Sequence, residues 1–348
     1  MSVAPRAGIP APDVPDAPIG PDAPGVPVAL DEAAPVTRRP GGQLWAILRR
    51  SRSAMIGIIV LGAFVLMALL APVIAPYPIT RRVGGVYDPP STAHPLGLDD
   101  GGIDMLSLLL QGGQTSLLIG FTAALISMVV GGGVGVVSGY FGGWLETALM
   151  RVTDFFLVVP LLPLAIVVSA VWGAKLSHMI IVIGLLIWTT TARLVRSEVR
   201  SIKERAYVRR ARSIGAGHGR IIVRHVLPQI GPLLIANMTL AIASAIFLEA
   251  ALAFLGLGDP AAITWGKIIE LGFVRTAVSA GAWWAIVPAG LCIALVVTAC
   301  SLIGQAVEEA LNPRLKVSHL TPRAFQLQAI RRADLAELAE QAESRARG

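Results

Sequence analysis

Charged residues and cysteines are both scarce in this sequence. Only 15% of its 348 residues are charged, whereas soluble domains average about a quarter. The two cysteines, Cys292 and Cys300, fall in one apolar segment. In a straight helix, with a rise of about 1.5 Å per residue, they lie too far apart for a disulfide bond, so we interpret both as apolar filler. With 54% hydrophobic residues and a mean hydropathy of +0.69, the chain is predicted to be a polytopic membrane protein.

Motifs of nucleotide-hydrolysing and metal-dependent enzymes are also missing. The sequence has no G-x-x-x-x-G-K-[ST] for ATP and no H-E-x-x-H for zinc. Its histidines at 178, 218 and 225 are not arranged with a nucleophile at membrane depth, and no basic region followed by an apolar core marks a secretory signal peptide. We therefore predict a chain that is not an enzyme and holds no cofactor or metal. The net charge of +7 favours membrane orientation and acidic partners over nucleic acid.

Three regions are predicted from composition. Residues 1–42 hold ten of the 24 prolines, a density that forbids helix and sheet, so we expect a disordered or polyproline arm. Residues 43–316 form the membrane domain, which opens with an amphipathic interfacial segment from Gln43 to Arg52. Residues 317–348 are expected to form a cytoplasmic tail with one more helix.

Six apolar runs in the membrane domain are of about the length that spans a bilayer. We therefore expect an all-α polytopic bundle. Five arginines between residues 38 and 52 precede the first run, which places the N-terminus in the cytoplasm. The predicted spans are at about 54–75, 116–137, 150–173, 179–195, 230–255 and 282–304.

A strongly basic stretch follows the fourth span. Between Arg193 and Pro228 it holds ten Lys/Arg against two acids, so the loop 196–228 is predicted to face the cytoplasm. Gly215 and Gly217 can take left-handed or otherwise strained conformations, which predicts two short helices with a bend. A loop that only fixes topology or binds anionic lipid is the alternative.

Several residues near or within the spans suggest local structure. Glycines crowd the later half of the second span, where they favour close helix packing: Gly131, Gly132, Gly133 and Gly135. Arg151 and Asp154 lie one helical turn apart and are expected to pair or to reach the interface, and Pro160 is expected to bend the third span. Glu249 is a functional-site hypothesis because it is an acid in a span, although we expect it near the outer end, within reach of water.

The basic loop resembles the cytoplasmic loop of ABC importer permeases, whose pattern is E-A-A, three residues, Gly, nine residues, then I-x-L-P. Ala211, Gly215 and Leu227-Pro228 match this pattern. The chain departs from it at three positions: Arg209 stands for the Glu, Arg210 for the first Ala and His225 for the Ile.

Further segments, in the same order, resemble the dipeptide, oligopeptide and nickel permeases. HPLGLDDGGIDMLSLLLQGG begins at His94 and departs from the family at Ile103 and Leu108; we expect its aspartates to cap turns rather than to bind a metal. The family's R-x-x-D-x-x-x-x-x-P spans Arg151 to Pro160. FLEAALAFLGLG, followed by Trp-Gly, and the closing EEALNPRLK extend the resemblance to Lys316.

This resemblance implies a type I ABC importer permease fold of about six transmembrane helices in a prokaryotic inner membrane, with both termini cytoplasmic. It implies import of di- or oligopeptides; nickel, glutathione or oligosaccharide are alternative substrates, and a stand-alone ion-coupled carrier is the alternative from another class. The implied partners are a second homologous permease, two ABC ATPase subunits that bring ATP and Mg²⁺, an extracytoplasmic solute-binding protein and membrane lipid.

The resemblance also assigns roles to individual residues. Those implied to couple to the ATPase are Tyr207, Arg209, Arg210, Ala211, Gly215, Ala216, Arg220, Arg224 and Pro228. Those suggested for the pathway or its gate are Asp154, Pro160 and Glu249.

Overall fold

A computed structural model of the chain describes Leu48, Arg49 and residues 51–311, all of which belong to one compact unit. The predicted arm 1–42, the tail 317–348 and most of the amphipathic segment before Arg52 lie outside the described residues. Helices make up almost all of the regular structure in the described part, where an isolated β-bridge joins Leu98 and Asp104. The predicted all-α architecture is therefore confirmed for this part of the chain.

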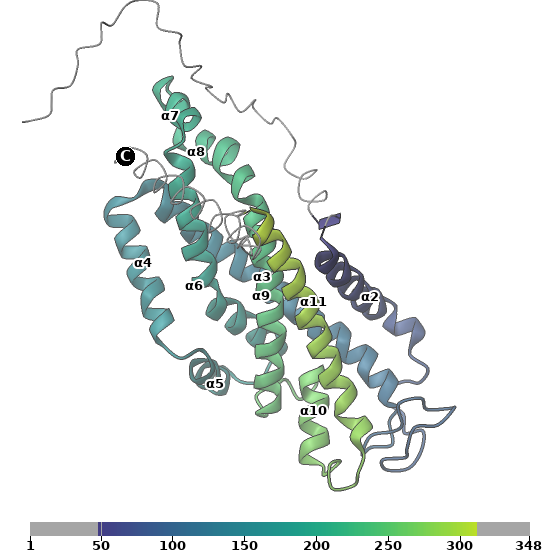
Figure 1. The fold of residues 1–348 in the computed structure, drawn as a ribbon. Helices are drawn as coiled ribbons and strands as arrows, with labels where there is room; N and C mark the ends of the chain where they lie inside the picture. Colours follow the sequence, from purple (N-terminus) through teal and green to yellow (C-terminus); the bar gives the residue numbers. More distant parts are fainter. Residues whose placement is uncertain (1–47, 50, 312–348) are drawn as a thin grey trace, which may run out of the picture. The chain divides into compact units, whose positions relative to one another are not determined.

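The helices follow one another along the chain, mostly with short connections; residues 75–104 form a longer one between α2 and α3 (Figure 1). In order they are α2 (Arg52–Ile74), α3 (Met105–Phe141), α4 (Gly143–Val158), α5 (Leu161–Trp172), α6 (Leu176–Lys203), α7 (Ala206–Ser213), α8 (His218–Ile221), the π-helical turn η1 (Ile222–Val226), α9 (Leu227–Phe254), α10 (Trp265–Val274), the 3-10 turn η2 (Trp283–Ala285) and α11 (Val287–Leu311).

Five helical segments are long and apolar enough to cross a membrane: α2, α3, α6, the continuous run His218–Phe254 and the main part of α11. The α4–α5 pair becomes a sixth span if its two halves are counted together. Figure 1 places α7 and α8 at one end of the bundle, here called the basic end, and residues 75–104 with α10 at the other, here called the opposite end.

Two predicted spans differ most from the structure. α3 begins at Met105, well before the predicted start at residue 116, because the Asp104 side chain caps it by accepting from the Ser107 N–H at 2.9 Å. The predicted single span 150–173 is broken into α4 and α5, which meet at 90°. Pro160 lacks an N–H and drives Val159 into the extended region, at φ −73° and ψ 126°.

Glycines bring α3 and α6 into close contact, the most extensive helix pairing among the described elements. A Cβ built on Gly135 would lie 2.7 Å from the Ala192 carbonyl oxygen, and one on Gly139 would lie 2.7 Å from the Arg196 carbonyl oxygen. Only a residue without a side chain fits at such a distance. The predicted packing role is confirmed at Gly135, whereas Gly133 faces open space.

Candidate functional site

The basic loop between α6 and α9 folds into two short helices joined at Gly215. α7 ends in a Schellman-type cap, in which the Ala216 N–H donates to the Ala211 carbonyl and the Gly215 N–H donates to the Arg212 carbonyl, both at 3.0 Å. Gly215 takes φ +82°, which costs other L-residues about 1–2 kcal/mol. Gly217 takes φ −65° and ψ 151° before α8. The predicted bend between two helices is confirmed, but the left-handed conformation belongs to Gly215 alone.

Buried side chains anchor this loop to the bundle. Val208 of α7 and Ile221 of α8 are fully buried, in a cluster with Val136 and Tyr140 of α3 and residues of α6. The Tyr140 hydroxyl lies 3.0 Å from Nδ1 of His218, the first residue of α8. Sequence reasoning missed this contact. The one signal that could have indicated it was a tyrosine at the end of a span. Because α8 and η1 continue into α9, the loop is joined to α9 on one side and to α6 on the other.

The other face of the loop presents positive charge to solvent. Four of its exposed arginines are Arg209, Arg210, Arg220 and Arg224. No described residue forms an ion pair with any of these four. Ile214, between α7 and Gly215, is 85% exposed. The loop therefore carries an exposed apolar residue and guanidinium groups that have no ion-pair partner in the described part of the chain.

The other residues implied to couple lie in or beside the same two helices. The Tyr207 hydroxyl accepts a hydrogen bond from the Gln229 side chain. The Tyr207 ring centroid lies 6.0 Å from that of His225, which stands where the family pattern has Ile. Ala211 and Ala216 are half-buried, and Pro228 is exposed at the start of α9.

Asp154 forms an ion pair that the sequence did not suggest. Its Oδ1 accepts from a guanidinium nitrogen of Arg193 on α6 at 2.5 Å, and both side chains are about half exposed. Arg151, the expected partner one turn away, forms no ion pair with any described residue. Of the two alternatives expected for these residues, an ion pair or a position at the interface, the Arg151–Asp154 pair is not formed, and Asp154 pairs with an arginine of α6 instead. The observed pair links α4 to α6.

Pro160 and Glu249 have different surroundings. Pro160 ends the α4–α5 break and lines a cavity. Glu249 is fully buried, which corrects the expectation that it reaches water. The Ser116 hydroxyl donates to Glu249 Oε2 at 3.3 Å and accepts from the Trp265 N–H at 3.1 Å. Glu249 therefore contributes to the contact of α3, α9 and α10 within this chain.

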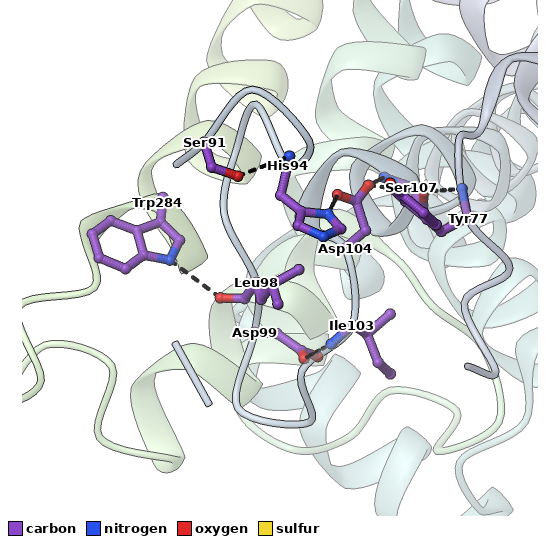
Figure 2. A network of polar contacts seen from close by, with 9 residues as sticks. All are labelled: Tyr77, Ser91, His94, Leu98, Asp99, Ile103, Asp104, Ser107 and Trp284. Atoms are coloured by element: carbon purple, nitrogen blue, oxygen red, sulfur yellow. Dashed lines mark hydrogen bonds and ion pairs between the residues drawn. The ribbon is translucent and has the colours of Figure 1, made fainter. Parts of the chain in front are cut away.

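At the opposite end, hydrogen bonds of His94, Asp99 and Asp104 fix the loop that precedes α3 (Figure 2). Nδ1 of His94 lies 2.9 Å from Asp104 Oδ1. Asp99 Oδ1 accepts from the Ile103 N–H at 2.7 Å, and burial raises the pKa of Asp99 above its ordinary value. The expectation that these aspartates cap turns is confirmed at Asp99 and Asp104. No group of His, Cys, Asp and Glu among the described residues has an arrangement suited to a metal ion.

This loop is also fastened to the last span. Figure 2 shows the indole of Trp284, in η2 before α11, directed at the loop, where its N–H donates to the Leu98 carbonyl at 3.1 Å. The two residues that depart from the family's arginines, Ile103 and Leu108, pack in the apolar cluster around Trp265. Leu108 is buried, so an arginine at that position would be cut off from water.

Sequence comparisons identify the family. Residues 131–317 match the family described as binding-protein-dependent transport system inner membrane component, and residues 39–90 match the N-terminal TM domain of oligopeptide transport permease C. A peptide transport system permease protein of Brucella suis biovar 1 is 38% identical over 272 residues, which cover 78% of this chain and 90% of that protein.

Two further relatives are similar over the same extent. The dipeptide transport system permease protein DppC of Alkalihalophilus pseudofirmus is 34% identical, over 77% of this chain and 88% of that protein. The oligopeptide transport system permease protein OppC of Bacillus subtilis is 32% identical, with the same coverages. A chain of the inward-facing MetNI methionine ABC transporter aligns with 60% of this chain and 98% of its own length, at 19% identity and a TM-score of 0.48. The chain belongs to the family of binding-protein-dependent transport system inner membrane components.

Proposed function

We propose that this chain is a membrane permease subunit of an ATP-driven importer of short peptides. Relatives between 32% and 38% identical bear the names of peptide, dipeptide and oligopeptide permeases. The observation that carries the coupling role is the basic loop, in which two anchored short helices expose four arginines without ion-pair partners in the described part. Such a face fits a partner protein better than it fits a loop that only sets topology.

The loop is built to transmit a movement into the bundle. Its buried residues Val208 and Ile221 hold it against α3 and α6, so a displacement of the loop moves those helices with it. Exposed guanidinium groups bind carboxylates through charge-assisted hydrogen bonds, so we expect an acidic groove on the ATPase subunit. Coupling requires that ATP binding in the partner favour one conformation of the permease over the other.

The proposal includes an orientation and a set of partners. The basic loop and both termini face the cytoplasm, since positively charged loops resist translocation. The chain itself is not catalytic and binds no cofactor. Two ABC ATPase subunits bind ATP and Mg²⁺, a second homologous permease completes the pathway, and an extracytoplasmic solute-binding protein delivers the peptide.

Charge reversal in the basic loop tests this function. In cells that lack the chromosomal copy, the chain carrying both Arg209→Glu and Arg210→Glu is expected to reach the membrane in normal amounts yet to support no uptake of radiolabelled trialanine. Arg81→Glu is the matched control, because Arg81 is an exposed arginine at the opposite end with no ion pair to any described residue. Normal uptake by the double variant contradicts the coupling role. Uptake that persists without ATPase subunits favours an ion-coupled carrier.

A further inference from the structure

A cavity of about 390 Å³ lies where the break between α4 and α5 meets α6 and α9. The break contributes Val159 and Pro160, α6 contributes Thr190, and α9 contributes Asn237 and Ser244. The volume falls at the small end of the range of ligand pockets, about 300–1,000 Å³. Non-helical backbone at membrane depth is tolerated where it lines a cavity or is buried in protein, so the break and the cavity are physically linked.

The polar part of the lining is entirely neutral. Among the described residues, no charged side chain lines the cavity; the polar side chains are hydroxyls and one amide, from Thr189, Thr190, Thr191, Asn237 and Ser244. Apolar side chains such as Phe156 and Leu240 make up the rest. A ligand in this cavity would therefore meet hydrogen-bonding groups without meeting a fixed charge.

Hydrogen bonds hold one of these groups in place and leave others available. Asn237 Nδ2 donates to the Thr191 hydroxyl at 2.7 Å, and that hydroxyl lies 3.4 Å from the Ser127 hydroxyl. Within the described part of the chain, the Asn237 side-chain carbonyl accepts no hydrogen bond. Thr190 and Ser244 are exposed, and their hydroxyls have no hydrogen-bond partner among the described residues. Polar groups at membrane depth are unfavourable unless something pairs with them.

We propose that this cavity receives the main chain of a peptide during its passage, through Thr190, Asn237 and Ser244. Main-chain N–H and C=O groups are neutral donors and acceptors that recur in every peptide, and these side chains supply both kinds of partner. The lack of a charged group lets the site take peptides whose side chains differ in charge. A lipid acyl chain would leave the three polar groups unpaired. This inference rests on the proposed function and adds a substrate-contacting site to it.

Removal of single hydrogen-bonding groups tests the site with little change in its shape. Thr190→Val and Ser244→Ala each remove one hydrogen-bonding group, and Asn237→Leu removes the amide. Thr298→Val is the matched control, because Thr298 is an exposed threonine of α11 outside this cavity. Each variant is expressed in cells that lack the chromosomal copy, and uptake of radiolabelled Ala-Ala-Ala, Ala-Asp-Ala and Ala-Lys-Ala is measured together with the abundance of the chain in the membrane.

We expect Thr190→Val and Ser244→Ala each to slow uptake of all three peptides by the same factor, about five-fold for one hydrogen bond. Asn237→Leu, which also removes the bond to Thr191, should slow all three at least as much, while Thr298→Val has no effect. Unchanged uptake by both Thr190→Val and Ser244→Ala overturns the site but leaves the proposed function standing. A loss confined to one peptide also overturns it, because side-chain recognition would then dominate.

Two further outcomes contradict the proposal in distinguishable ways. If the variants no longer co-purify with the second permease, the cavity is an interface between subunits rather than a peptide site. If the wild-type chain supports uptake of none of the three peptides, the proposed function fails, and the ligand assigned to the cavity fails with it.

Discussion

Close packing of α3 on α6 makes Gly135 the most informative position for a stability measurement. A methyl group at this position would lie 2.7 Å from the Ala192 carbonyl oxygen and 2.7 Å from the Val195 Cβ. Ordinary van der Waals contact begins at 3.4 Å, so the two helices must separate by about 0.7 Å at this turn, since backbone and a β-branched carbon cannot rotate away. Overpacking of this kind costs about 1–3 kcal/mol.

Gly133→Ala provides the matched control on the same helix. A Cβ built on Gly133 has nothing within 4 Å. Both substitutions gain the same helix propensity, up to about 1 kcal/mol, so the difference between them isolates the contact with α6. We expect Gly135→Ala to be less stable than Gly133→Ala by about 1–3 kcal/mol.

Thermal unfolding of the tagged chain in mild detergent measures this difference. With about 2–4 °C of midpoint per kcal/mol for a domain of this size class, Gly135→Ala should unfold about 2–12 °C below Gly133→Ala. It should also reduce peptide uptake, because α6 leads directly into α7. Equal midpoints would refute the reasoning, since they would mean that α3 and α6 are not in backbone contact at this position.

Further substitutions test three local features. Gly215→Ala forces alanine into φ +82° and should cost about 1–2 kcal/mol, seen as faster amide exchange in α7, whereas Gly217→Ala at φ −65° should leave exchange unchanged. Asp104→Ala removes the cap of α3 and should lower the free energy of unfolding by about 1 kcal/mol, with faster exchange in the first turn of that helix as the readout. Glu249→Gln should keep both the hydrogen bond from Ser116 and peptide uptake; abolished uptake in this variant would argue that the carboxylate itself is required. Glu249→Ala should lower the thermal midpoint, because a buried Ser116 hydroxyl left without its acceptor costs about 1–3 kcal/mol.

Features that depend on local chemistry were predictable from the sequence. Long apolar runs predicted the spans because every backbone polar group in lipid must be paired within its own helix. The bend at Gly215 was predictable because a glycine after a basic helix is a common helix end. Pro160 predicted a bend for the same local reason, although the 90° angle at the break depends on how α4 and α5 pack.

Features that depend on contacts between distant residues were not predictable in this way. The burial of Glu249 depends on Ser116 of another helix, and the Asp154 pair depends on Arg193 of α6. The early start of α3 was missed because Asp104 was read as a loop residue. The neutral cavity joins α4, α5, α6 and α9, and single hydroxyl residues within apolar runs carry no pattern that predicts which of them share a surface.

Identification of the proteins that accompany this chain tests the central claim most directly. The tagged chain is purified from the membranes of its own host in mild detergent, and the proteins that accompany it are identified by mass spectrometry, with the Arg209→Glu/Arg210→Glu chain in parallel. The account predicts an ABC ATPase and a second permease with the wild type, and loss of the ATPase alone from the double variant. Recovery of the folded wild-type chain by itself would contradict the account and favour an autonomous carrier.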